Sequence, residues 1–277
     1  MFPRFPCPAV SPSPACRWGC KSSGSHSRRR LCSGWRTPMS RPPTGTPAAR
    51  PSNAREGHRS LQPAIGRCIM AEDIGLMEAI HSQRQITRYR NDPVSREDIE
   101  KIIDAAIRAP SGGNTQPWHF IAITDPELIE KIGGLYRDIW LGAQGAEPRP
   151  DEPPAYRQAR QLAHKMPEVP AMILVCVDHT KGSAPYTPGQ PIERGRYASS
   201  IWLAIQNLFL AARALGLGTR ITTVHIRGEE QIKEWLGIPE HVETVCLTPL
   251  GYPRGSFGPT QRQPAEEVSS FNRYGSR

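Results

Sequence analysis

The sequence predicts an α+β domain with a mixed central sheet flanked by helices. Segments with helical spacing and segments with strand spacing alternate irregularly along residues 70–277, which is typical of this class. These residues carry 23 of the 35 basic and 25 of the 26 acidic side chains, a net charge of −2. A nearly neutral segment of this length can bury a sizeable core as one domain.

Residues 1–69 hold the basic excess of the chain. They contain twelve basic residues and one acid, with 11 of the 29 prolines and five of the seven cysteines. This composition predicts a disordered Arg/Pro/Ser-rich extension, and its early prolines oppose the amphipathic helix of a transit peptide. Cys16-x3-Cys20 lacks the second cysteine pair of a zinc site, and Arg28–Arg30 come without a nucleic-acid-binding motif. We therefore expect neither metal nor nucleic acid here.

Residues 70–277 lack the signatures of several common chemistries. No run of 18 apolar residues predicts a membrane span. The two remaining cysteines, Cys176 and Cys246, lie in apolar runs, which indicates a reducing, cytoplasmic setting. No metal-ligand motif, phosphate-binding glycine loop or G-x-S-x-G nucleophile turn is present. We expect no metal, no membrane and no protein nucleophile.

Helical spacing of apolar residues predicts five helices. They cover residues 74–83, 95–109, 125–136, 197–215 and 228–236. Ser95, with Asp98 three residues later, caps the second helix, and Gly216 is placed to end the fourth. The fourth helix is apolar almost all round, which predicts burial in a core or in an oligomer interface.

Three apolar segments predict strands. They cover Trp118–Thr124, Val169–Val177 and Val242–Leu247, and Pro249–Gly251 is expected to stop the last one. The second is a nearly continuous apolar run, which suits a strand buried on both faces.

Residues 137–168 are expected to form a long loop, because four prolines lie among Arg, Gln and Gly without a regular pattern. Loops of this length are usually functional lids or flexible segments. Residues 180–195 and 254–277 also lack a pattern, and the latter would be ordered only by packing on something.

The sharpest candidate site is Ala109–Trp118, with the sequence APSGGNTQPW. Its Ser, Asn and Gln side chains offer directed donors and acceptors without charge, and Gly112 and Gly113 let the backbone approach a ligand closely. This chemistry suits a planar heterocycle with carbonyls and ring nitrogens. The alternative is a turn whose polar side chains satisfy its own backbone.

A second candidate is the pair Arg84 and Arg88. Their guanidinium groups could clamp a phosphate, or could lie in a solvated basic turn. Two further segments, Gly216–Thr223 and Leu250–Pro253 with Arg262 after it, carry little information alone.

Taken in order, these segments resemble the FMN-dependent nitroreductase family over about residues 74–270. In that family the APSxxNxQPW loop contacts the flavin and its ribityl chain. The resemblance implies this role for the following residues: Pro110, Ser111, Asn114 and Gln116.

The opening R-R-S-x-R segment of the family binds the FMN phosphate. Arg84 and Arg88 match its outer positions, while Gln85 and Ile86 depart from the usual Arg and Ser. A shift of one residue would instead bring in Gln83 and Thr87.

Two later segments complete the implied cofactor site. The G-L-G helix end and the residues after it imply flavin contacts at the following positions: Gly218, Ile221, Thr222 and Thr223. Of these, Ile221–Thr223 resemble the segment that brings a donor to the flavin N5 in the deiodinase branch. Arg262, before Pro264 and a pair of Glu, matches the arginine that reaches the phosphate.

The resemblance implies a nitroreductase-like α+β sandwich that forms an intertwined homodimer, with FMN in each of two interface clefts. The helix over 197–215 would pack across the twofold axis, with Ile205 near the centre of the interface. The patternless C-terminus would wrap the other subunit.

The implied activity is that of an FMN-dependent NAD(P)H oxidoreductase. NADH or NADPH would pass hydride to the flavin N5, and a nitroaromatic, quinone or similar conjugated acceptor would take it by a ping-pong mechanism. The chemistry is on FMN, so no catalytic side chain is implied. A deiodinase-like or flavin-fragmenting member of the family, and a flavin-binding redox sensor without efficient turnover, stay open as alternatives.

Overall fold

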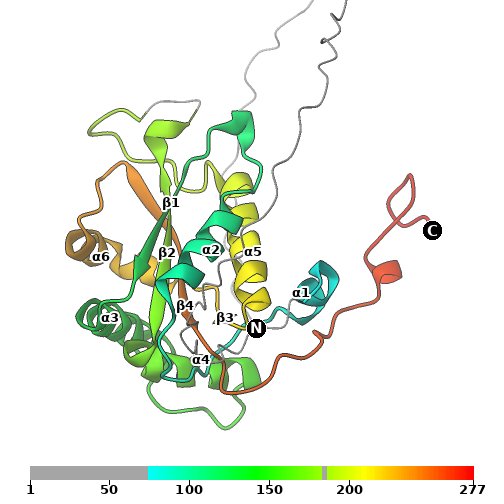
Figure 1. Cartoon of the computed structure of the whole chain (residues 1–277), viewed down its shortest axis with the longest axis horizontal. Coiled ribbons are helices and arrows are strands. Elements are labelled where there is room, and N and C mark those ends of the chain that lie inside the picture. Colours follow the sequence, from blue (N-terminus) through cyan, green and yellow to red (C-terminus); the bar gives the residue numbers. More distant parts are fainter. Residues whose placement is uncertain (1–73, 183–185) are drawn as a thin grey trace, which may run out of the picture. The chain divides into compact units, whose positions relative to one another are not determined.

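A computed structural model describes residues 74–182 and 186–277 of the 277-residue chain. All of them belong to one compact unit, Pro63–Arg277. Helices cover both faces of a central sheet (Figure 1). The predicted disorder of residues 1–69 and the question of zinc or nucleic acid there lie outside the described residues.

The sheet has four strands in the order β1-β2-β4-β3. Their bounds are β1 Trp118–Ile123, β2 Ala171–Asp178, β3 Gly218–Thr219 and β4 Val242–Gly251. All neighbouring strands pair antiparallel, and the one parallel pairing among the described residues is a bridge between Gln85 and Thr219. The α+β class is therefore confirmed.

The central strand β2 is buried on both faces, as its continuous apolar run predicts. Alternate residues point to opposite sides of the sheet, so Ile173 and Val175 join one core cluster while Met172 and Leu174 join the other. The molecule thus has two cores, one on each face of one sheet.

Helices α2 (Arg96–Ala106) and α5 (Ala198–Ala214) cover the first face. The predicted cap of α2 is present, because the Ser95 hydroxyl accepts the backbone N–H of Asp98 at 3.0 Å. The interface position expected for Ile205 is wrong. Ile205 is 2% exposed inside the core of its own chain, whereas Leu203 on the outer face of α5 is 47% exposed.

The second face is covered by α3 (Pro126–Gln144), α4 (Pro154–Lys165) and α6 (Glu229–Leu236). The loop predicted over 137–168 is therefore wrong for most of its length. Pro153 and Pro154 lie at the cap and first turn of α4, where proline begins a helix instead of breaking one. The short connection is fastened by an ion pair between Arg160 and Glu152, both buried.

The predicted stop of the last strand is also wrong, because β4 continues through Pro249 to Gly251. On one side Pro249 lies opposite Met172 of β2. On the other side β3 pairs only with Leu250 and Gly251. Pro249 has no backbone N–H, and the short β3 strand does not need a hydrogen bond from that position.

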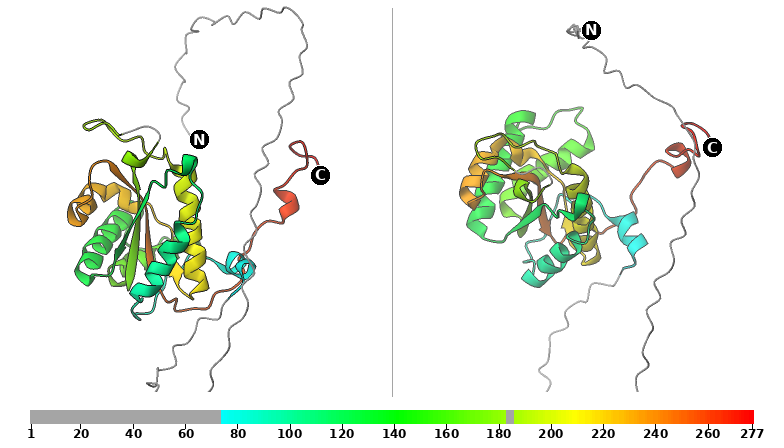
Figure 2. Two further views of the ribbon diagram at one scale, coloured as in Figure 1. Left: turned by 45° about the horizontal axis from the view of Figure 1, so that its top comes forward. Right: turned by 90° about the horizontal axis from the view of Figure 1, so that it is seen from above.

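Helix α1 (Leu76–Ser82) and the C-terminal arm, residues 254–277, stand apart from the sheet (Figure 2). The arm passes α1, where Thr260 donates its N–H to the carbonyl of His81 at 2.9 Å. The apolar face predicted for α1 is not buried in one chain, since Leu76 is 68% and Met77 61% exposed.

Five 3-10 turns complete the described structure: η1 Gly112–Asn114, η2 Met166–Glu168, η3 His179–Lys181, η4 Val224–Gly228 and η5 Ala265–Glu267. Within the described part of the chain, no helix is both long enough and apolar enough to cross a bilayer.

Candidate functional site

The predicted flavin loop holds its polar side chains in a fixed, exposed arrangement. Asn114 and Gln116 have φ values of 54° and 46°, a backbone region that non-glycine residues seldom adopt and that is often found at functional sites. The Ser111 hydroxyl accepts the N–H of Gln116 at 3.0 Å, and the Gln116 amide donates to the Asn114 carbonyl oxygen at 3.2 Å. Exposed Pro110 begins the loop.

This loop docks on the N-terminal end of α5. The Gly112 N–H donates to the hydroxyl of Ser200 at 3.2 Å. The Thr115 hydroxyl is buried and has no protein partner. The loop is therefore attached to helix α5, while the side chains of Asn114 and Gln116 are exposed.

The other predicted flavin segments meet at the opposite end of α5. The side-chain oxygen of Gln85 accepts the N–H of Ile221 at 2.6 Å, and the N–H of Ile86 donates to the carbonyl of Thr219 at 2.9 Å. Gly218 is required at this crossing, since a Cβ there would lie 2.7 Å from the Ile86 side chain. Residues 85–86 and 218–221 thus form one structural unit.

A cavity of about 520 Å³ opens beside this unit. Arg84 and Arg262 line it, and so does Gln83, whose buried side-chain nitrogen has no hydrogen-bond partner. No acid is among its lining residues, and the set is Gln83, Arg84, Gln85, Gln158, Pro259, Thr260, Gln261 and Arg262. Two guanidinium groups and an unused amide donor make this cavity suited to an anion.

The structure does not bring Arg88 into this cavity. Arg88 and Thr87 line a different one, whereas Arg84 and Gln83 share the first. Neither register of the predicted phosphate segment is therefore reproduced whole. This segment lines the first cavity with three consecutive residues, 83–85. The sequence motif instead predicted residues spaced four positions apart.

Thr222 and Thr223 differ in environment. Thr222 is buried, bridges to Leu247 of β4 and lies beside Tyr136. Burial raises the pKa of Tyr136, although Thr222 and Arg220 partly oppose this. Thr223 is exposed and borders a small cavity of about 140 Å³ together with Trp202. Of the pair, Thr223 is the one available to a ligand.

The two halves of the predicted site are far apart in one chain. Ser200 holds the loop, while Arg213 near the other end of α5 donates to Ser82 at 2.9 Å, next to the phosphate segment. Thirteen helical residues separate these anchors, which corresponds to roughly 20 Å along the helix axis.

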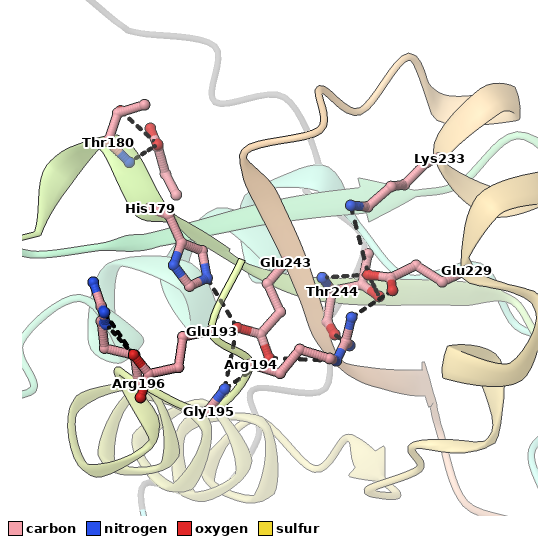
Figure 3. A network of polar contacts seen from close by, with 11 residues as sticks. His179, Thr180, Glu193, Arg194, Gly195, Arg196, Glu229, Lys233, Glu243 and Thr244 are labelled. Carbon is pink, nitrogen blue, oxygen red and sulfur yellow. Dashed lines mark hydrogen bonds and ion pairs between the residues drawn. The ribbon is translucent and has the colours of Figure 1, made fainter. Parts of the chain in front are cut away.

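A partly buried polar network, which the sequence patterns did not reveal, fixes the chain that leads into α5 (Figure 3). Glu243 lies 3.0 Å from the His179 Nε2 atom and accepts the N–H of Gly195 at 3.2 Å. Arg194 donates to Glu229 at 2.5 Å and to the carbonyl of Thr244 at 2.9 Å. The sequence signal that could have indicated this network is Glu243, an acid within an apolar strand segment.

Electrostatics in this network favour the charged form of the Glu229 carboxylate. Burial raises the pKa of Glu229, but the hydroxyl and N–H of Thr244 and the charges of Arg194 and Lys233 outweigh it, so the pKa lies below its ordinary value. Figure 3 shows these groups converging from β4, α6 and residues 193–196. The network therefore anchors the start of α5, and through Ser200 the predicted flavin loop.

Two thiols are buried near the centre of the sheet. Burial raises the pKa of Cys176 and of Cys246 to about 12, so neither forms a thiolate near neutrality. Among residues 74–182 and 186–277, no group of three His, Cys, Asp or Glu side chains is arranged to hold a metal ion.

Comparison with known proteins gives relatives with several named activities. The chain is 30% identical over 199 residues to NADH dehydrogenase of Thermus thermophilus, covering 67% of this chain and 90% of the relative. It is 29% identical to 5,6-dimethylbenzimidazole synthase of Rhodospirillum rubrum, covering 65% and 82%, and 27% identical to iodotyrosine deiodinase 1 of Rattus norvegicus, covering 66% and 64%.

Solved structures share the fold. A nitroreductase with bound FMN from Desulfitobacterium hafniense matches with a TM-score of 0.55 at 22% identity, covering 71% of this chain and 98% of that one. The profile of the Nitroreductase family matches residues 80–252, more than half of the chain. The chain therefore belongs to the nitroreductase family and is an oxidoreductase of that family.

Proposed function

We propose that the protein binds FMN and uses NADH or NADPH to reduce a nitroaromatic, a quinone or a similar conjugated acceptor. The observation that carries this proposal is the cavity with Arg84, Arg262 and the unpartnered Gln83 amide. Its cationic lining fits the terminal phosphate of FMN. Bound FMN would supply the capacity to accept and donate hydride.

The residues of the chain have separate tasks in this proposal. Arg84 and Arg262 bind the phosphate by charge-assisted hydrogen bonds. Gln85 holds the N–H of Ile221 in place, which fixes the backbone that leads to Thr223. The loop side chains Asn114 and Gln116 present amide donors and acceptors to the edge of a heterocycle.

The separation of the loop from the phosphate cavity favours a homodimer. Because the two segments attach to α5 roughly 20 Å apart along its axis, we expect that one chain does not offer both halves to one cofactor. A twofold-related copy would bring its own loop to the phosphate cavity of the first chain. The exposed apolar side chains of α1 and the outer face of α5 are available for that contact.

Flavin analysis tests the cofactor. Purified protein is expected to show a flavin spectrum, with FMN identified by mass spectrometry after heat release. Arg262→Ala should weaken FMN binding by roughly tenfold or more, because a charge-assisted hydrogen bond is lost. Arg273→Ala, in the same arm but outside the cavity lining, is the matched control. Release of FAD, or a colourless protein that does not bind added FMN, would refute the proposal.

An acceptor panel tests the activity. NADH and NADPH oxidation should be measured with a nitroaromatic, a quinone and a halogenated tyrosine. The last acceptor probes a deiodinase-like reaction, which the similarity to iodotyrosine deiodinase 1 and the exposed Thr223 hydroxyl favour as the second candidate. Tight FMN binding without turnover of any acceptor would instead favour a redox sensor.

A further inference from the structure

Two arginines lie side by side where the segment before α2 pairs with the segment that follows β4. Residues 88–90 and 252–254 pair antiparallel around the bridge Tyr89–Pro253. The N–H of Arg254 donates to the carbonyl of Arg88 at 3.0 Å, which places the two residues directly opposite. Opposite side chains share one face with Cβ atoms about 5 Å apart, and like charges in such a pair repel.

The described residues do not neutralise this pair. The Arg254 Nε donates to the carbonyl of Tyr89 at 2.8 Å, which uses only one of its nitrogens. Neither guanidinium forms an ion pair within the described part of the chain. By contrast, the neighbouring Arg90 pairs with Asp92 at 2.9 Å and lies over the ring of Tyr252 at 5.1 Å. Of the arginines on these two segments, Arg90 is therefore compensated by an acid, whereas Arg88 and Arg254 have no ion pair among the described residues.

Both arginines line a cavity of about 650 Å³. Helix α4 supplies Gln161, His164 and Lys165 to its other wall. Glu168 is the one acid among its lining residues, and both of its carboxylate oxygens lie 2.9 Å from Lys165. With Lys165 neutralised by Glu168, the two arginines leave a net positive charge inside a recess.

This cavity is distinct from the one assigned to FMN. Arg84 and Gln85 line the flavin cavity, whereas Thr87 and Arg88 line this one. Both cavities are lined by residues of the segment 83–89 and of helix α4. Gln158 of α4 borders the first cavity, and Gln161 borders the second. Anions held in the two places would be neighbours.

We propose that the Arg88–Arg254 cavity is an anion site that takes a phosphate group, either as a monoester or as the free ion. Two guanidinium forks side by side match the tetrahedral oxygens of that group, which carries close to two negative charges. The source is either the 2′-phosphate of NADPH or free orthophosphate. The first source rests on the proposed function and makes NADPH the preferred reductant.

Calorimetric titration of the flavin-loaded protein with NADP⁺, NAD⁺ and orthophosphate tests the site. If the 2′-phosphate is the ligand, NADP⁺ binds roughly tenfold tighter than NAD⁺, and Arg88→Gln and Arg254→Gln remove the difference. If free phosphate is the ligand, the two nucleotides bind alike and orthophosphate binding is lost in both variants. Arg90→Gln, on the same segment as Arg88 but outside the cavity, should behave as wild type.

Two results would overturn the inference. One is that neither NADP⁺ over NAD⁺ nor orthophosphate shows binding that depends on Arg254. The other is that Arg88→Gln releases FMN while Arg254→Gln changes nothing, which would return Arg88 to the flavin site. A protein that oxidises neither NADH nor NADPH refutes the proposed function separately, because the orthophosphate titration needs no turnover.

Discussion

At the scale of single residues, His225 lies where a charge would be costly. Its side chain is buried just after Thr222 and Thr223, with 1% exposure. Burial lowers its pKa from 6.5 to about 4, and the attraction of Glu229 only partly offsets this. The folded protein therefore keeps His225 neutral at pH values where the unfolded chain protonates it.

The free energy of unfolding should consequently fall as the pH drops from 6.5 towards 4. The unfolded state binds a proton in this window that the folded state does not, and the loss approaches about 3 kcal/mol for a shift of this size. His225→Leu should flatten this part of the profile, whereas His119→Gln on the surface should not. Urea unfolding at several pH values measures both. An unchanged slope in His225→Leu would mean that another group governs the profile.

At the scale of elements, the two faces of α5 differ: one packs into the core of its own chain, and the other is the face proposed to contact a partner. Ile205, Leu208 and Phe209 pack into the core on the sheet face that α2 and α5 cover. Trp202 and Leu203 face outward, 38% and 47% exposed. Because the loop at 110–116 and the segment after Ser82 attach to opposite ends of this helix, α5 also sets the spacing of the two proposed half-sites.

Substitutions on the two faces of α5 should affect different properties: folding on the buried face and dimer formation on the exposed face. Ile205→Glu buries an unpaired carboxylate and should cost roughly 4 kcal/mol or more, preventing folding. Leu203→Glu should leave the circular dichroism spectrum intact but abolish the proposed dimer, and with it FMN retention and reductase activity. Sedimentation equilibrium and flavin absorbance on the same sample decide. A folded Leu203→Glu monomer that still holds FMN and oxidises NAD(P)H would show that one chain builds the whole site.

At the scale of the whole molecule, charge and family match divide the chain in the same way. Residues 1–69 carry a net charge of +11, while the remaining residues are nearly neutral. The family match covers residues 80–252, which includes the sheet and its helices. The elements that form the two cores and the candidate site therefore all lie beyond the basic segment.

A chain that begins at Met70 is expected to keep the melting temperature and the flavin content of the full chain. The physical reason is that residues 1–69 offer almost no apolar periodicity with which to contribute a core. Differential scanning calorimetry and flavin absorbance compare the two proteins. A drop of several degrees, or loss of FMN, would show that the basic segment packs on the domain.

Local patterns determined much of the fold. The Ser95 cap, the strand at β1 and the double burial of β2 follow from neighbouring residues, because capping and side-chain alternation act over a few positions. The polar loop at 110–116 was also visible, since its residue types already define its hydrogen-bonding chemistry.

Only the tertiary structure decided the features that depend on distant contacts. Pro153 and Pro154 suggested a loop but begin α4, whose preceding connection is held by the Arg160–Glu152 pair. The spacing of Arg84 and Arg88 suggested one phosphate clamp, yet the chain places them in two cavities. Arg88 lies in the second cavity because its backbone pairs with Arg254, 166 positions later. No local sequence pattern predicts a hydrogen bond between residues so far apart in the chain. Sequence alone thus determined the chemistry of each segment, and tertiary packing decided which segments share a site.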